Sequence, residues 1–185
     1  MLFFLGIALF FGAHGAMAVA RPLRARLIER LGENGYRGAY SLVSLAGIVL
    51  LVMGWASAPA TSLFYPPYWL RHVAYLFTLL GFIALASAYL PAGRIKAALK
   101  HPMLVGVKFW ALAHLLVNGE IRSLALFGAF LAFGVIDRIA VKRRGEPTPA
   151  AGPPVNDAIA VGLGVLGWGA VYFFLHPLIA GVPLR

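Results

Sequence analysis

The chain has 185 residues, of which 61% are hydrophobic and 12% charged, and its mean hydropathy is +0.84. A soluble domain carries about 25% charged residues, so this composition excludes an ordinary water-soluble globule. The formal net charge is +10. In so apolar a chain, this surplus points to orientation across a bilayer rather than to nucleic acid. The chain has no cysteine, which excludes disulfides, thiolate metal sites and cysteine nucleophiles.

Stretches without charge predict the membrane-spanning segments, because a helix needs roughly 20 mostly apolar residues to cross a bilayer. Charges and prolines delimit six such stretches. We therefore expect an all-α fold, a polytopic membrane helix bundle that forms one domain over residues 1–185. The six predicted spans are about 1–20, 38–58, 71–90, 103–118, 121–141 and 158–180.

The connections between the spans carry signals of their own. Leu23, Leu27 and Leu31 fall four residues apart with arginines between them, which predicts an amphipathic helix on the membrane surface between the first two spans. Small residues at 16–20 resemble a signal-peptide cleavage site, but the positive charges follow the apolar run, so we expect the first helix to be retained. The connection 142–157 is basic and rich in proline, which predicts an exposed loop.

The positive charges test the number of spans independently. Twelve cations fall in the first, third and fifth connections: Arg21, Arg24, Arg26, Arg30, Arg37, Arg94, Lys96, Lys100, Arg138, Lys142, Arg143 and Arg144. Three fall on the other side: Arg71, Arg122 and Arg185. Because Lys and Arg accumulate in cytoplasmic loops, this split predicts a multi-pass protein of the bacterial inner membrane with both termini on the periplasmic side.

The carboxylates are expected to be charge partners or helix caps. Asp137 is beside Arg138, Glu120 is two residues from Arg122, and Asp157 precedes the last span, where it can cap that helix. No carboxylate lies in the middle of a span, where a proton relay would need it. The pattern therefore does not favour a hydrolase built on paired carboxylates.

Histidines within spans are rare, and they carry the functional hypothesis. His14 lies roughly 10 Å from the cytoplasmic end of its span and His114 roughly 16 Å from the cytoplasmic end of its own, at about 1.5 Å per residue. His101 lies at the cytoplasmic mouth of the same span as His114. We expect these three to lie in one half of the membrane, and His72 and His176 in the other.

Two imidazoles at this depth suit haem b, which takes only axial ligands from the protein, better than zinc, which takes three or four. Small residues surround His14, and Trp110 forms a flat wall one turn before His114. Four cations lie toward the cytoplasmic rim, where haem propionates would emerge: Arg24, Arg26, Arg37 and Lys108. The other interpretation is that each histidine bonds to a backbone or hydroxyl partner and packs in the core. The residues alone leave both open.

Six runs, taken together and in this order, resemble the NnrU family of integral membrane proteins: residues 11–14, 30–33, 36–47, 71–72, 101–106 and 110–119. That family is named for a gene linked to nitrite and nitric oxide metabolism in denitrifying bacteria. It includes the 15-cis-zeta-carotene isomerase of plants and cyanobacteria, a membrane haem b protein. The resemblance implies that His14 and His114 are the metal ligands, with His101 in the neighbouring His-Pro motif. The isomerase's further histidine, near the end of the second span, has no counterpart in residues 50–60.

The resemblance implies two functions. One is an accessory haem protein that senses or exchanges electrons or nitric oxide in support of denitrification. The other is a haem-dependent cis–trans isomerase of a carotenoid or a similar polyene, acting without net redox change. A haem-free membrane interaction protein is the third interpretation. The expected partners are the lipid bilayer and a polyene or nitric oxide, and nucleic acid is not among them.

Overall fold

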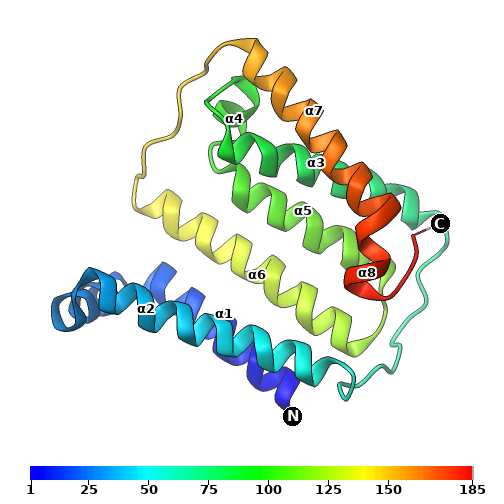
Figure 1. The fold of residues 1–185 in the computed structure, drawn as a ribbon, viewed down its shortest axis with the longest axis horizontal. Helices are drawn as coiled ribbons and strands as arrows, with labels where there is room; N and C mark the ends of the chain where they lie inside the picture. Colours follow the sequence, from blue (N-terminus) through cyan, green and yellow to red (C-terminus); the bar gives the residue numbers. More distant parts are fainter. Residues whose placement is uncertain (185) are drawn as a thin grey trace. The chain divides into compact units, whose positions relative to one another are not determined.

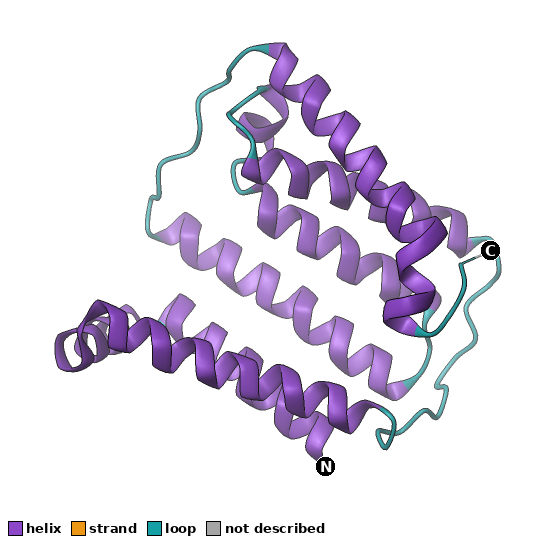
Figure 2. Cartoon of the chain, in the orientation of Figure 1, coloured by secondary structure: helices purple, strands orange, loops and turns teal. Residues whose placement is uncertain are grey.

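The computed structural model describes residues 1–184, which form helices joined by loops, with no β-strand in that range (Figures 1 and 2). Five helices are long and apolar enough to cross a membrane by length and composition, and a sixth apolar helix is shorter. The chain is therefore a multi-pass membrane protein of the all-α class, as its composition predicts.

The helices form two compact units, which we describe separately. Unit 1 comprises Met1–Pro66 and Asn118–Glu146. It contains α1 (Leu2–Val19), α2 (Arg21–Trp55) and α6 (Ile121–Arg143). Unit 2 comprises Pro67–Val117 and the chain from Pro147 onward. Its helices are α3 (Leu70–Tyr89), α4 (Arg94–Leu99), α5 (Pro102–Val117), α7 (Pro154–Ala170), the π-helical turn η1 (Val171–Leu175) and α8 (His176–Ala180).

In unit 1, glycines let α1 and α2 approach each other closely. A Cβ atom on Gly47 would lie 2.9 Å from the Cβ of Phe10, and one on Gly54 would overlap the backbone of Phe3. Gly6, on α1, faces the backbone of Leu51 in the same way. The order of these contacts shows that the two helices run antiparallel. Lipid chains are as apolar as the helix surfaces, so such close packing is what holds membrane helices together.

A break at Gly32 divides α2 into two parts. Gly32 has φ 70° and ψ 164°, a conformation that costs glycine little because it has no Cβ. Residues 21–31, which carry the leucine and arginine pattern, form the first part, and residues 33–55 form the second. The second part is about 34 Å long at 1.5 Å per residue, enough to cross a bilayer. The fold thus separates the amphipathic helix from the second span, as the sequence predicts.

The loop that follows α2 binds to the start of α6 through its backbone. The Leu63 N–H donates to the Gly119 carbonyl at 2.9 Å, and the Ile121 N–H donates to the Thr61 carbonyl at 3.1 Å. Arg122 forms an ion pair with Glu120 at 2.8 Å, and its guanidinium lies 4.8 Å from the centre of the Trp55 ring. These contacts fasten α6 to the end of α2.

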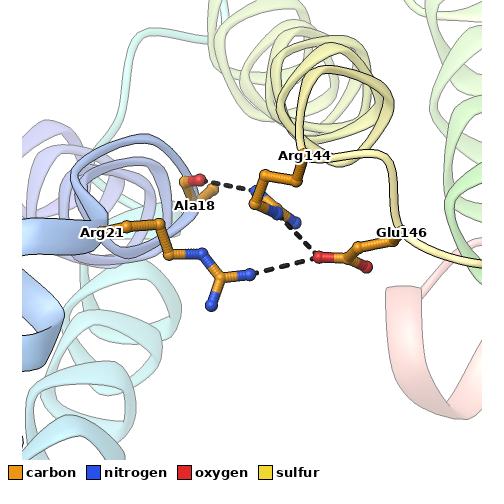
Figure 3. A network of polar contacts seen from close by, with 4 residues as sticks. All are labelled: Ala18, Arg21, Arg144 and Glu146. Atoms are coloured by element: carbon orange, nitrogen blue, oxygen red, sulfur yellow. Dashed lines mark hydrogen bonds and ion pairs between the residues drawn. The ribbon is translucent and has the colours of Figure 1, made fainter.

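A polar network holds the opposite end of unit 1 (Figure 3). Glu146 accepts a hydrogen bond from Arg144 at 2.7 Å and one from Arg21 at 3.2 Å through the same carboxylate oxygen. Arg144 also donates to the carbonyl of Ala18 at 2.9 Å. That carbonyl is in the last turn of α1, where backbone oxygens have no partner within the helix. The first residues of the predicted loop 142–157 are therefore held by α1 and α2.

In unit 2, α3 packs against both α5 and α7. Gly81 and Gly106 face each other where α3 meets α5, and a Cβ on Gly106 would lie 3.0 Å from the Gly81 carbonyl. On α7, a Cβ on Gly164 would lie 2.6 Å from the Cα of Ile83. Trp168 donates from Nε1 to the Thr78 hydroxyl at 3.0 Å, which adds a polar link between α7 and α3.

The third connection contains a short helix, α4, that the sequence pattern did not predict, and Asp157 caps it. The Asp157 carboxylate accepts hydrogen bonds from the backbone N–H groups of Arg94 and Ile95, each at 2.9 Å. The prediction that Asp157 caps its own helix is wrong. Because proline is favoured in the first turn of a helix, α7 begins at Pro154, four residues before the predicted start. Asp157 therefore lies inside the first turn of α7, from which its carboxylate reaches α4.

Candidate functional site

The five histidines divide unevenly between the two units. His14 lies in unit 1, and His72, His101, His114 and His176 lie in unit 2. His14 and His114 therefore belong to different units, and their pairing at one iron stays a prediction.

In unit 1, His14 lies in an aromatic environment contributed by all three helices. Its Nδ1 donates to the carbonyl of Phe10, one turn earlier, at 2.8 Å. Its ring centre lies 4.1 Å from that of Phe10, 5.2 Å from Tyr40 on α2 and 5.7 Å from Phe133 on α6. An imidazole that donates from Nδ1 carries its lone pair on Nε2, the nitrogen through which it can bind a metal.

A line of contacts connects His14 to the basic end of unit 1. Tyr40 stacks on Tyr36 with ring centres 6.0 Å apart, and the guanidinium of Arg24 lies 5.4 Å from the centre of the Tyr36 ring. Of the other two predicted cations in this unit, Arg26 is exposed, and Arg37 instead forms an ion pair with Glu33 at 3.0 Å. The Arg37 side chain is 70% exposed, so Arg24 is the cation that the aromatic residues join to His14.

In unit 2, His114 has the same local geometry. Its Nδ1 donates to the carbonyl of Trp110 at 2.8 Å, and the two ring centres lie 5.0 Å apart. The prediction that Trp110 and His114 share a face of their helix is confirmed. Lys108 lies six residues before His114, about 120° around the helix axis, so it is on a different face.

His114 also contacts a second histidine. The rings of His114 and His176 lie 6.5 Å apart between centres, with their planes inclined by 21°. His176 donates from Nδ1 to the carbonyl of Val182 at 2.8 Å. The two imidazoles therefore lie near each other, each with Nδ1 bonded to a backbone oxygen.

This contact overturns the predicted division of the histidines by depth. His114 was expected in the half opposite to His176, yet the two are neighbours. The reason is the length of α5, which has 16 residues and ends three residues after His114. A position about 16 Å from one end is then only about 5 Å from the other. His101 precedes α5 and lies about 20 Å from His114 along the axis, so the expectation that those two approach each other is also wrong.

The histidines of the described residues lie singly or in a pair. In residues 1–184, no group of three or more His, Asp or Glu side chains is placed to hold a metal ion. Haem iron takes four ligands from its porphyrin and one or two from the protein, so a single imidazole or a pair is sufficient. The carbonyl bond at Nδ1 is the second-shell contact that ligating histidines commonly have.

The sequence patterns missed the π-helical turn η1, which stands directly before His176. One signal was present: Pro177 follows His176 within an apolar run. Proline has no N–H to donate, and its ring clashes with the carbonyl four residues earlier, here that of Phe173. Phe173 lies within η1, where the wider turn accommodates this conflict.

A protein-family model described as "NnrU protein" matches residues 2–184, nearly the whole chain. No curated protein and no solved structure matches the chain.

Proposed function

Because the chain belongs to the NnrU family, we propose that it is an integral membrane haem b protein, accessory to nitrite and nitric oxide metabolism. In this proposal His14 and His114 supply imidazole ligands, as the family resemblance implies. When bound, haem supplies one-electron chemistry and affinity for nitric oxide. The role of the protein is to hold the cofactor and to determine its environment.

The observation that supports the proposal best is the hydrogen bonding of these two imidazole rings. Each donates from Nδ1 to a carbonyl four residues earlier in its own helix, at 2.8 Å. That bond orients the ring and leaves the basic nitrogen at Nε2. The aromatic rings around His14 and beside His114 favour a flat, apolar ligand.

The cations complete the proposal. Haem propionates are anionic and are stabilised where cations line the rim of the pocket. Arg24, which is linked to His14 through Tyr36 and Tyr40, is well placed for this role. The 12 cations of the first, third and fifth connections further support a cytoplasmic location for the end of the helices near Arg24. In this proposal the protein lies in the bacterial inner membrane, with both termini periplasmic.

The test is the absorption spectrum of the full chain, expressed with ample haem supply and purified in detergent. We expect a Soret band, paired visible bands on reduction, and a shift of the Soret band when nitric oxide is added to the reduced protein. A colourless preparation with normal helical circular dichroism would overturn the haem proposal and favour the haem-free interaction protein.

A second assay separates the two haem functions. Reduced protein is incubated with a cis-polyene in mixed micelles, and the isomers are separated by chromatography. The accessory function predicts no isomerisation above that of free haem in the same micelles. Catalytic turnover of the polyene would overturn it in favour of the isomerase.

A further inference from the structure

We propose that the first part of α2, residues 21–31, is a docking surface for the headgroups of anionic phospholipids, and that Arg26 and Arg30 contact the lipid phosphates. This inference goes beyond the proposed haem function and does not depend on it. The attachment of the segment to two membrane spans, its exposed leucines and its arginines carry the inference.

The segment is attached to an apolar, membrane-crossing helix at each end. Only Ala20 separates it from α1, which ends at Val19, and Gly32 separates it from the second part of α2. At about 1.5 Å per residue, residues 21–31 are roughly 16 Å long, too short to cross a hydrocarbon core of about 30 Å. Figure 1 shows the segment, in blue, at the end of unit 1 where α1 finishes. The two spans therefore hold it at the level of the lipid headgroups.

The apolar side of the segment is partly open. Leu23 is 42% exposed and Leu31 is 50% exposed. At about 100° of rotation per residue, Leu23, Leu27 and Leu31 project within a sector of roughly 80°, so they form one stripe along the helix. An exposed leucine stripe on a short helix at the membrane surface buries itself among the headgroups and the first carbons of the lipid chains.

Two of the four arginines in the segment have partners within unit 1. Arg21 donates to Glu146 at 3.2 Å, and Arg144, at the end of α6, donates to the same carboxylate oxygen at 2.7 Å (Figure 3). The guanidinium of Arg24 lies 5.4 Å from the centre of the Tyr36 ring. These contacts fix the segment on unit 1 and determine which of its faces points outward.

The other two arginines, Arg26 and Arg30, are exposed, and neither forms an ion pair within residues 1–184. They are four residues apart and therefore lie on one face, along an edge of the leucine stripe. Glu29 is the one carboxylate among residues 21–31, against four arginines. Lys142 and Arg143 are exposed beside Arg144 and add positive charge at the same end of unit 1.

Anionic phospholipids match both features of this surface. The long apolar stem of an arginine allows its guanidinium to reach the phosphate level while the neighbouring leucines enter the bilayer. The guanidinium then binds two phosphate oxygens at once. An acidic protein segment would match the arginines but would leave the leucine stripe open to water. The combination of stripe and cations therefore favours a lipid surface.

The first experiment measures the binding of fluorescent phosphatidylglycerol to the full chain in an uncharged detergent. The variant Arg26→Gln/Arg30→Gln removes the two proposed contacts. The matched control is Arg94→Gln/Lys100→Gln, which removes two exposed cations of the third connection and changes the net charge equally. Unlabelled phosphatidylglycerol, phosphatidylcholine and inorganic phosphate serve as competitors. Helical circular dichroism and a single elution peak verify the fold of each variant.

We expect the affinity to fall about fivefold for each arginine, roughly 25-fold for the pair, and to change little in the control. Phosphatidylglycerol should compete, whereas phosphatidylcholine and inorganic phosphate should not. Unchanged binding in Arg26→Gln/Arg30→Gln, or an equal loss in the control, would overturn the inference. Competition by inorganic phosphate at the same concentration would also overturn it, since the site would then bind free phosphate.

A second experiment tests the orientation of the segment in a bilayer of phosphatidylcholine and phosphatidylglycerol. Because the chain has no cysteine, a spin label on an introduced cysteine reports one position. Leu23→Cys lies on the stripe, and Ala25→Cys, also at an exposed position, lies about 160° away from the centre of the stripe. The label at 23 should be quenched by oxygen dissolved in the lipid, and the label at 25 by a water-soluble nickel complex. If the nickel complex reaches both labels equally, the surface does not face lipid, and an acidic protein partner is favoured instead.

Discussion

Units 1 and 2 use the same principle of close glycine packing but treat their histidines differently. In unit 1, two long helices pack tightly, and the single histidine lies among aromatic rings. In unit 2, a π-helical turn and two short helices interrupt the regular pattern, and two imidazoles meet. Regular helices thus bring whole segments together, whereas the irregular segment of η1 and α8 places the single side chain of His176 beside His114.

The largest expected effect concerns the packing of unit 1. Gly54→Ala places a methyl group onto the backbone of Phe3, which is 1% exposed. Since a helix backbone cannot yield as a side chain can, α1 and α2 must separate, at a cost of about 2–3 kcal/mol in the free energy of unfolding. Unfolding in a titration with sodium dodecyl sulfate, followed by circular dichroism, measures this.

The control is Gly38→Ala in the same helix, where an added Cβ meets nothing within 4 Å. It should be neutral or stabilising by up to about 1 kcal/mol, because alanine favours helix. Equal destabilisation by both substitutions would show that close packing of α1 and α2 does not hold unit 1 together.

The next effect concerns α4, one of the two short helices of unit 2. Asp157→Ala removes the acceptor for the N–H groups of Arg94 and Ile95, and loss of such a cap costs about 1 kcal/mol. Hydrogen exchange should accelerate across α4 and change little in unit 1. Asp137→Ala, on α6, serves as the control. Unchanged exchange in α4 would mean that the cap does not maintain this helix.

The smallest effect concerns the polar network of unit 1. Glu146→Gln removes the charge that Arg21 and Arg144 share. Because these side chains are 22–47% exposed, the loss should be under about 1 kcal/mol and should shrink further in high salt. Thermal unfolding at low and high ionic strength measures it. A loss that does not depend on salt would contradict an electrostatic role.

Much of the fold follows from local features. Leu70–Tyr89 and Ile121–Arg143 begin within one residue of the predicted spans, because charges and prolines bound them directly. The site was less predictable. Depth counted from the cytoplasmic end of α5 does not show that His114 lies close to the other end of this 16-residue helix. A sequence pattern shows helix caps only between neighbours in the chain, so it cannot show that Asp157 reaches α4.

By itself, the sequence determined the apolar segments, the amphipathic stretch before the second span and the family to which the chain belongs. These properties depend on the composition of short stretches, since transfer into a bilayer is summed over the residues of each segment. Only the tertiary structure decided that Asp157 caps α4 and that His176 lies beside His114. Those contacts join residues more than 60 positions apart, and their geometry depends on where each helix ends and on how one π-helical turn rotates the chain.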